Sequence, residues 1–312
     1  MSRNIPRCRI EPTAESQFVF TIHGREVTRW HFSPLAPGPF FYPVRGPSGK
    51  SLTRMGHPGA PNHDHHRSLW FAHEKLLGVD FWSIGKPPRI VQKQWYAIDD
   101  KHDFARIGFV LHWLDGHDPQ PLITHDLIAT IRPHSDDPSS GWSLELQSDF
   151  SSRSEGVEFR QSNFGILGLR LAKSISAHFG GGIISGQNGK VGEAELFGVA
   201  NRWMDYSGPS HLDSNGVEAV EGITLIDHRG NPNSPCKWHV RSDGWMGPSL
   251  SRDSEVAIPN GKPLTVRYLL DIHPGLYDSQ RALSMADRFD TTTRVSIEKS
   301  TQPHRQYEFS NT

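Results

Sequence analysis

Residues Gln17–Phe32 read QFVFTIHGREVTRWHF, and this stretch decides the fold class. Apolar and polar side chains alternate along Gln17–His23, Gly24 interrupts the run, and the alternation resumes along Glu26–Phe32. A period of two places apolar side chains on one face of an extended chain, and a glycine between two such runs is typical of a tight turn. The stretch therefore predicts a β-hairpin with one face against the core.

The same pattern returns along the rest of the chain. Seven further runs predict strands: Phe104–Leu114, Leu122–Ile131, Trp142–Phe150, Val157–Gln161, Gly165–Ala172, Val217–Ile226 and Leu264–Ile272. Sheets with so many strands curl or split into two packed layers. The sequence therefore predicts an all-β fold, a large antiparallel β-sandwich.

One late segment, Asp278–Phe289, predicts a short helix, because its apolar residues recur at helical spacing behind an aspartate that can cap the first turn. The 29 glycines and 23 prolines are spread through the gaps rather than gathered in one linker. We therefore expect residues 1–312 to form a single domain, with 1–15 and 300–312 peripheral or frayed.

Composition narrows the class of partner. The formal net charge of the 312 residues is −1 and the pI is near 7, so no strong field draws the protein to nucleic acid or to anionic lipid. No apolar run is long enough for a membrane helix, and Cys8 and Cys236 are too few for a disulfide framework, which favours buried thiols. We expect a cytoplasmic protein, either a monomer or a homo-oligomer, that binds a small molecule.

The strongest chemical signal is NHDHHRSLWFAH, Asn62–His73, which holds four of the chain's 18 histidines. Prolines just upstream favour a loop, whereas Leu69–Ala72 has the pattern of a buried strand. Loops on a rigid scaffold often carry catalytic groups, and imidazole is the side chain that titrates near neutrality. If the backbone were already extended here, His63, His65 and Arg67 would share one face.

Three interpretations of this cluster remain open. In the first, His65 and His66 transfer protons and Arg67 holds a substrate oxygen, with His63 and His73 completing the pocket. In the second, His63 and His65 bind a divalent metal with a distant third ligand. In the third, the histidines only cap turns.

Other residues could complete a binding site. Trp70 and Trp82 could stack on the C–H faces of a sugar ring, although such residues are more often core. Arg170 lies in an apolar strand and needs a carboxylate or a ligand if it is buried. His228 follows a strand in a polar turn and His239 lies next to Trp238, so both are further substrate-binding candidates. No phosphate loop, dinucleotide fingerprint or nucleophile elbow is present, which disfavours a nucleotide cofactor.

Several motifs along the chain form a recognisable set: Tyr42–Pro43 with Ser48–Lys50, His63–His73, Gly78–Trp82, Gly168–Ala172, Trp203–Tyr206, Asp227–His228 with Asn231–Pro232, and Trp238–His239. In these motifs the chain resembles a bacterial family known as PmoA-like or DUF6807. The resemblance implies a relative of the galactose-mutarotase supersandwich and a carbohydrate ligand. Methane monooxygenase subunits, to which the first label refers, lie in membranes, and this chain has no spanning segment.

The sequence therefore supports three hypotheses of function. The leading one is an enzyme that acts on a sugar or oxidised sugar derivative by histidine-mediated proton transfer, as an epimerase, lyase or hydrolase. The second is a metal-dependent enzyme. The third is a non-catalytic carbohydrate-binding protein, which needs aromatic side chains but no clustered titratable groups.

Overall fold

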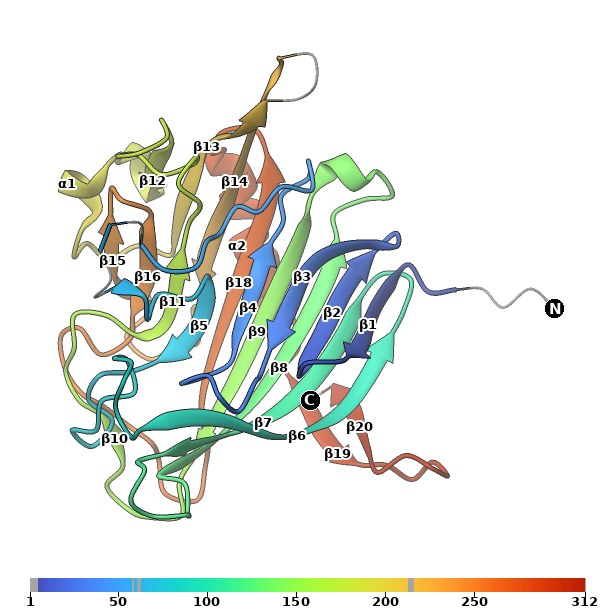
Figure 1. Ribbon diagram of the computed structural model, residues 1–312, viewed down its shortest axis with the longest axis vertical. Coiled ribbons are helices and arrows are strands. Elements are labelled where there is room, and N and C mark those ends of the chain that lie inside the picture. The colour runs from blue at the N-terminus through green and yellow to red at the C-terminus, as the bar shows by residue number, and fades with distance from the viewer. Residues whose placement is uncertain (1–4, 58, 61–62, 213–215, 312) are drawn as a thin grey trace.

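Two eight-stranded antiparallel sheets face each other across an apolar core in the computed structural model, which describes residues 5–57, 59–60, 63–212 and 216–311 (Figure 1). The first sheet has the order β1 (Cys8–Thr13), β2 (Gln17–Ile22), β3 (Arg25–His31), β4 (Phe40–Val44), β5 (Leu69–Ala72), β11 (Ile166–Arg170), β16 (Trp245–Ser249), β15 (Lys237–Arg241). The second has the order β12 (Ile183–Gly186), β13 (Trp203–Leu212), β14 (Glu218–Asp227), β18 (Leu264–Pro274), β9 (Trp142–Ser151), β8 (Ile123–Pro133), β7 (Ala105–Leu114), β6 (Arg89–Asp100). The predicted antiparallel sandwich is confirmed.

The predicted hairpin is β2 paired with β3, and its alternation places Phe18, Phe20 and Ile22 in the core. Across the core, the Trp30 ring of β3 stacks on Phe109 of β7, with ring centroids 5.0 Å apart. Aromatic pairs of this kind bury large apolar areas, so they help to hold the two sheets together.

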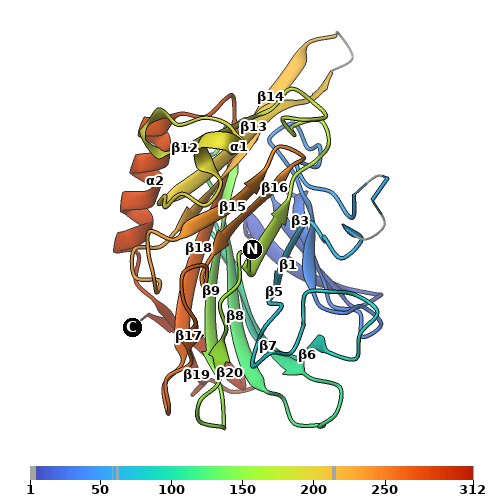
Figure 2. The same ribbon diagram turned by 90° about the vertical axis from the view of Figure 1, so that its left-hand side faces the viewer.

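The late helix is confirmed as α2 (Ser279–Thr291), and Asp278 caps it by accepting hydrogen bonds from the backbone N–H groups of Gln280 and Arg281. The helix packs on the outer side of the second sheet (Figure 2). A second helix, α1 (Glu193–Leu196), was not predicted from the sequence. None of the helices in the described ranges is long and apolar enough to cross a membrane.

Described residues within the expected peripheral or frayed segments 1–15 and 300–312 form paired strands. The strand β1 pairs with β2 and buries Cys8 and Ile10, because its alternation continues the apolar face of the hairpin. Near the other end, β20 (Tyr307–Asn311) pairs with β19 (Val295–Lys299). Two short strands, β10 (Glu158–Phe159) and β17 (Val256–Ala257), form a separate antiparallel pair. Both cysteines are buried free thiols, as predicted.

Candidate functional site

The histidine segment forms a turn rather than an extended strand. The backbone N–H of His63 donates to the Ala60 carbonyl at 2.8 Å, and that of His66 donates to the His63 carbonyl at 3.0 Å. The alternating faces expected for an extended 63–67 segment are therefore wrong. The turn instead gathers three rings, with centroids 4.4 Å apart for His65–His66, 5.0 Å for His63–His66 and 5.9 Å for His63–His65.

An aromatic platform supports this turn on the face of the first sheet that points away from the core. Along β5, Leu69 and Phe71 join the main core, whereas Trp70 joins a separate outer cluster with Trp82 and Trp245. The His66 ring stacks on Trp245 at 5.0 Å and 20°, and it lies 5.6 Å from Trp70. Trp70 therefore underlies the histidines, and its predicted contact with a sugar ring stays a prediction.

Glycine at position 168 allows two tryptophans of this platform, Trp70 and Trp245, to meet above β11. A Cβ atom on Gly168 would lie 2.7 Å from the Trp245 ring and 2.9 Å from the Trp70 ring. Such distances require one of the rings to move, and His66 rests on both of them.

Gly168→Ala is therefore expected to lower the free energy of unfolding by about 1–3 kcal/mol, the usual cost of overpacking, and to shift tryptophan fluorescence. Urea unfolding measures the first effect. Gly38→Ala is the matched control, because its Cβ would find only an ordinary contact at 3.5 Å with Ile90. Equal losses in the two variants would contradict the role of Gly168.

A pocket of about 540 Å³ opens beside the histidines. Its lining combines imidazoles, charged groups and aromatic rings: His63, His65, His66, Glu74, Trp82, Ser83, Phe164, Arg170, His239, Arg241, Asp243 and Trp245. Six of the predicted site residues are thus brought together: His63, His65, His66, Trp82, Arg170 and His239. The size falls within the range of small-molecule sites.

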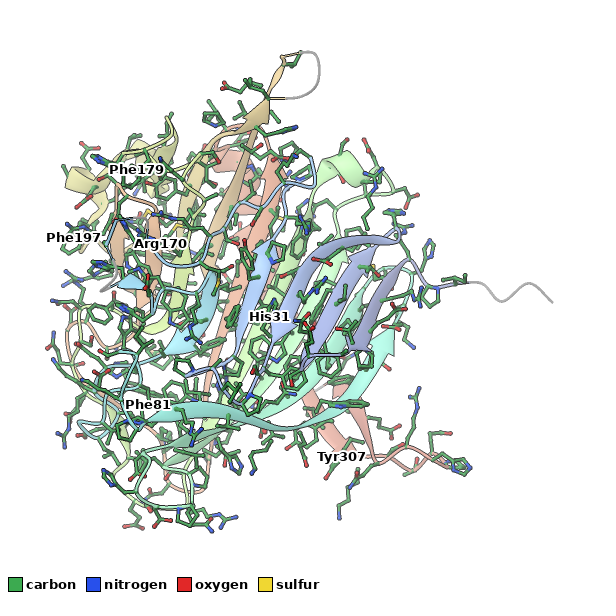
Figure 3. All side chains as sticks on the ribbon, in the orientation of Figure 1. His31, Phe81, Arg170, Phe179, Phe197 and Tyr307 are labelled. Atoms are coloured by element: carbon green, nitrogen blue, oxygen red, sulfur yellow. The ribbon has the colours of Figure 1, made fainter. Side chains whose placement is uncertain are left out.

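An ion pair between the buried Arg170 and the half-buried Asp243 lies in the wall of this pocket. Two Arg170 nitrogens donate to the two carboxylate oxygens of Asp243, at 2.9 and 3.2 Å, so the carboxylate that this buried arginine required is present. Figure 3 shows Arg170 near the end of the sandwich formed by β11, β15 and β16. Burial opposes ionisation of Asp243, but the hydrogen bond and charge of Arg170 outweigh it and lower the pKa of the carboxyl.

A second guanidinium supports the same carboxylate-bearing turn. Arg54 donates to the backbone carbonyls of Leu171 and Asp243, and burial together with the charge of Arg170 lowers the pKa of Arg54 to about 10. His57 places its Nε2 3.2 Å from the Asp243 carboxylate. Arg170 therefore binds the Asp243 carboxylate, and Arg54 holds the backbone of the same turn.

Burial lowers the pKa values of the site histidines to different extents. It lowers the pKa of His66 to about 2, and the neighbouring His65 and Arg170 act in the same direction. Burial also lowers the pKa of His239 to about 4 and lowers that of His63. His66 is therefore neutral at physiological pH, and its buried Nδ1 has no hydrogen-bond partner in the described part of the chain.

Four of the predicted site residues do not line this pocket: Trp70, which lies beneath the histidines, and Arg67, His73 and His228. Arg67 donates to the Gly38 carbonyl at 3.2 Å and lies over the Phe40 ring, in a narrow neighbouring hollow that shares His65 and Trp82 with the pocket. Its predicted position in the main pocket is wrong, because its contacts with Gly38 and Phe40 hold it in the neighbouring hollow.

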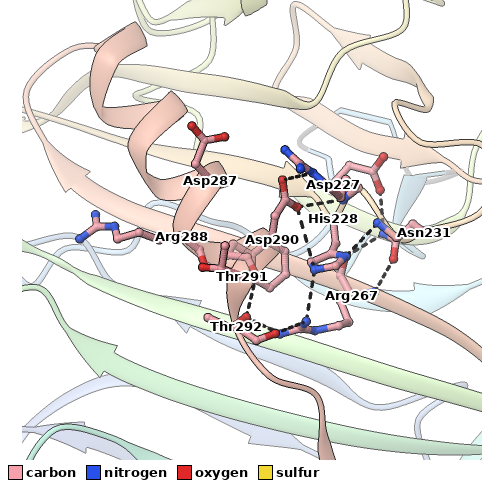
Figure 4. Close-up of polar contacts among 12 residues, drawn as sticks. Asp227, His228, Asn231, Arg267, Asp287, Arg288, Asp290, Thr291 and Thr292 are labelled. Carbon is pink, nitrogen blue, oxygen red and sulfur yellow. Dashed lines mark hydrogen bonds and ion pairs between the residues drawn. The ribbon is translucent and has the colours of Figure 1, made fainter. Parts of the chain in front are cut away.

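His73 was also expected in the pocket, but it points into the core. It shares the strand parity of Leu69 and Phe71, and its Nε2 lies 3.0 Å from the Ser251 hydroxyl. His228 lies at the end of β14 in the other sheet, where its ring contacts Phe289 of α2 and its Nε2 lies 3.2 Å from Arg267 (Figure 4). The placement of both residues in one pocket with His65 is therefore wrong.

Sequence reasoning missed several lining residues, including Glu74, Phe164, Asp243 and Trp245. Glu74 directly follows the histidine segment, and its carboxylate accepts a hydrogen bond from the Ser162 hydroxyl at 2.8 Å. Among the residues that the structure describes, no group of three or more His, Cys, Asp or Glu side chains is arranged to hold a metal ion. The metal-binding hypothesis, which names His63 and His65 as ligands, stays a prediction.

Comparison with solved structures finds a candidate mutarotase, YeaD, from Salmonella typhimurium, which is 9% identical with a TM-score of 0.36, over 88% of this chain and 96% of that one. None of the curated proteins matches the sequence. A family model matches residues 17–287, which include both large sheets except β1. The chain therefore belongs to DUF6807, a family of unknown function.

Proposed function

We propose that the pocket binds a sugar or oxidised sugar derivative and transfers a proton to or from it, as an epimerase, lyase or hydrolase. One observation carries this proposal: four imidazoles, two carboxylates and two arginines line the same pocket of about 540 Å³ as Trp82 and Trp245. Flat aromatic faces suit the C–H faces of a sugar ring, and the polar groups suit its hydroxyls. Arg170 and Arg241 balance the formal charges of Glu74 and Asp243 on this lining, so the proposed class includes both neutral and oxidised sugars.

The residues divide into roles by environment. His65 is partly exposed and borders the pocket, so we assign it the proton transfer. His66 is buried and held neutral, so it contributes a polar, uncharged surface rather than an acid. Glu74 supplies a carboxylate on the same lining. Pairs of titratable groups in contrasting environments are the usual basis for separate acid and base roles.

The test incubates the untagged protein in D₂O with D-glucose, D-galactose, D-glucuronate, D-galacturonate and D-gluconate. Proton NMR then detects new products, exchange between anomers and loss of C–H signal to deuterium. We expect at least one probe to bind and react.

Binding without chemistry would favour the carbohydrate-binding alternative, and neither binding nor chemistry with any probe would contradict the proposal. Elemental analysis of the same untagged sample addresses the metal-dependent alternative, which requires a stoichiometric metal and inactivation by a chelator.

A further inference from the structure

A second concave site lies on the opposite side of the sandwich, between α2 and the outer face of the second sheet. It has a volume of about 480 Å³. The helix buries Ala282, Ala286 and Phe289 against the sheet, and the neighbouring stripe of Arg281, Ser284, Met285 and Arg288 lines the groove. Strands β8 and β9 form the facing wall with Arg132, Ser143 and Glu145. We call this site the α2 groove.

The carboxylates at the α2 groove are already paired. Asp271 is fully buried and accepts two hydrogen bonds from Arg281, both 2.8 Å, while Nε2 of His134 lies 3.0 Å away. Glu145 accepts a hydrogen bond from Arg267, which also donates to Thr292. Each acid thus has its own guanidinium, and no negative charge remains to neutralise a further cation.

Two arginines of the groove lack such a partner. Arg132 lies over the Phe104 ring, 4.8 Å from its centroid, and Arg288 donates to the Ser284 carbonyl and contacts the Met285 sulfur. Neither forms an ion pair within the described ranges. Because Arg132 comes from the sheet and Arg288 from the helix, two guanidiniums converge on the groove from its two walls.

The floor between them is apolar and is formed by Leu269, Met285 and Phe289. Guanidinium groups match carboxylates and phosphates, with which they form paired charge-assisted hydrogen bonds. We propose that the α2 groove binds a small organic anion, a carboxylate or phosphate ester that also carries an apolar ring or chain. This ligand differs from the sugar of the histidine pocket, and the two sites lie on different sheets.

Methionine methyl NMR tests this directly, because Met285 lines the groove whereas Met204 and Met246 lie in the core. Protein labelled at the methionine methyls is titrated with phenyl phosphate, phenylacetate, inorganic phosphate and benzyl alcohol. We expect phenyl phosphate, phenylacetate or both to shift Met285 saturably and to leave the two core methyls in place. Comparison of these two probes distinguishes a phosphate ester from a carboxylate.

Arg132→Gln and Arg288→Gln should each weaken that binding about tenfold or more, because each removes a charged hydrogen-bond donor. Arg305→Gln removes the same charge from an exposed position in the tail and should leave affinity unchanged. The core methyl shifts report whether each variant is folded. Equal binding of benzyl alcohol, an unmoved Met285 with both acids, or wild-type affinity in both folded variants would overturn the proposal.

Discussion

Acidification from pH 7 to pH 5 is expected to lower the free energy of unfolding by several kcal/mol. Three buried histidines carry the effect: burial lowers the pKa of His66 to about 2, that of His125 to about 3 and that of His73 to about 4. Their ordinary pKa is about 6.5, so below that pH the unfolded chain takes up protons that the folded chain does not. Stability is therefore fully present above pH 6.5 and falls as the pH decreases toward the folded pKa values.

The expected size follows from about 1.36 kcal/mol per pH unit for each group, which gives the three imidazoles an effect on the order of 6 kcal/mol at pH 5. Two buried carboxyls act in the opposite direction, because burial raises the pKa of Asp126 and of Asp227 to about 6. They offset roughly 2–3 kcal/mol at pH 5. A net loss on the order of 3 kcal/mol is a large part of the stability of an ordinary domain.

Urea unfolding at pH 7, 6 and 5 measures this loss, and His125 offers the sharpest variant. Its ring is fully buried between Phe71 and Phe150, and its Nε2 contacts the Ser148 hydroxyl at 2.9 Å. Gln at position 125 can keep that contact without titrating, so the difference between pH 7 and pH 5 should shrink by about 2 kcal/mol. His117→Gln, at an exposed site, is the control. A free energy of unfolding that stays constant or rises on acidification would contradict the prediction.

The fold was predictable because its signals are local. Alternation along Gln17–His23 gives the strand, and a capping aspartate before a helical spacing gives α2, so neither depends on distant contacts. The same alternation could also have placed His73 correctly. His73 and Trp70 are separated by an odd number of positions, so in an extended chain their side chains point to opposite faces of the sheet.

The site was predictable only in part, because its composition depends on which strands pair. Asp243 and Trp245 reach the histidines through the pairing of β11 with β5 on one side and with β16 on the other. That order joins segments about 75 residues or more apart in sequence, and the local pattern of each strand does not specify it. The predicted location of His228 was wrong for the same reason. A polar turn at the end of a strand in the second sheet has the same sequence pattern as a loop of the first sheet.

Alanine at position 65 is expected to lower turnover of the reacting panel sugar by a factor of 10²–10⁴, the usual contribution of a positioned acid or base. The argument rests on contrast within the cluster. His66 is buried with a pKa of about 2, so it cannot hold a proton at neutral pH, whereas His65 is partly exposed and lines the pocket. The sequence alone made the two histidines equal candidates, and burial separates them.

The variants His65→Ala, His66→Ala and His117→Ala are compared under the conditions that give product with wild type. His65→Ala should keep its thermal unfolding midpoint, because the His65 ring is partly exposed and meets Trp82 edge-on at 6.1 Å, whereas the buried His66 ring stacks on Trp245 at 5.0 Å. His66→Ala should lose stability as well as activity, and His117→Ala neither. Added imidazole should restore part of the turnover of His65→Ala, because a free base can occupy the vacated space, and it should not rescue a variant whose platform has collapsed. Full activity of a folded His65→Ala would remove proton transfer from this residue and leave His63 and Glu74 as the groups to test.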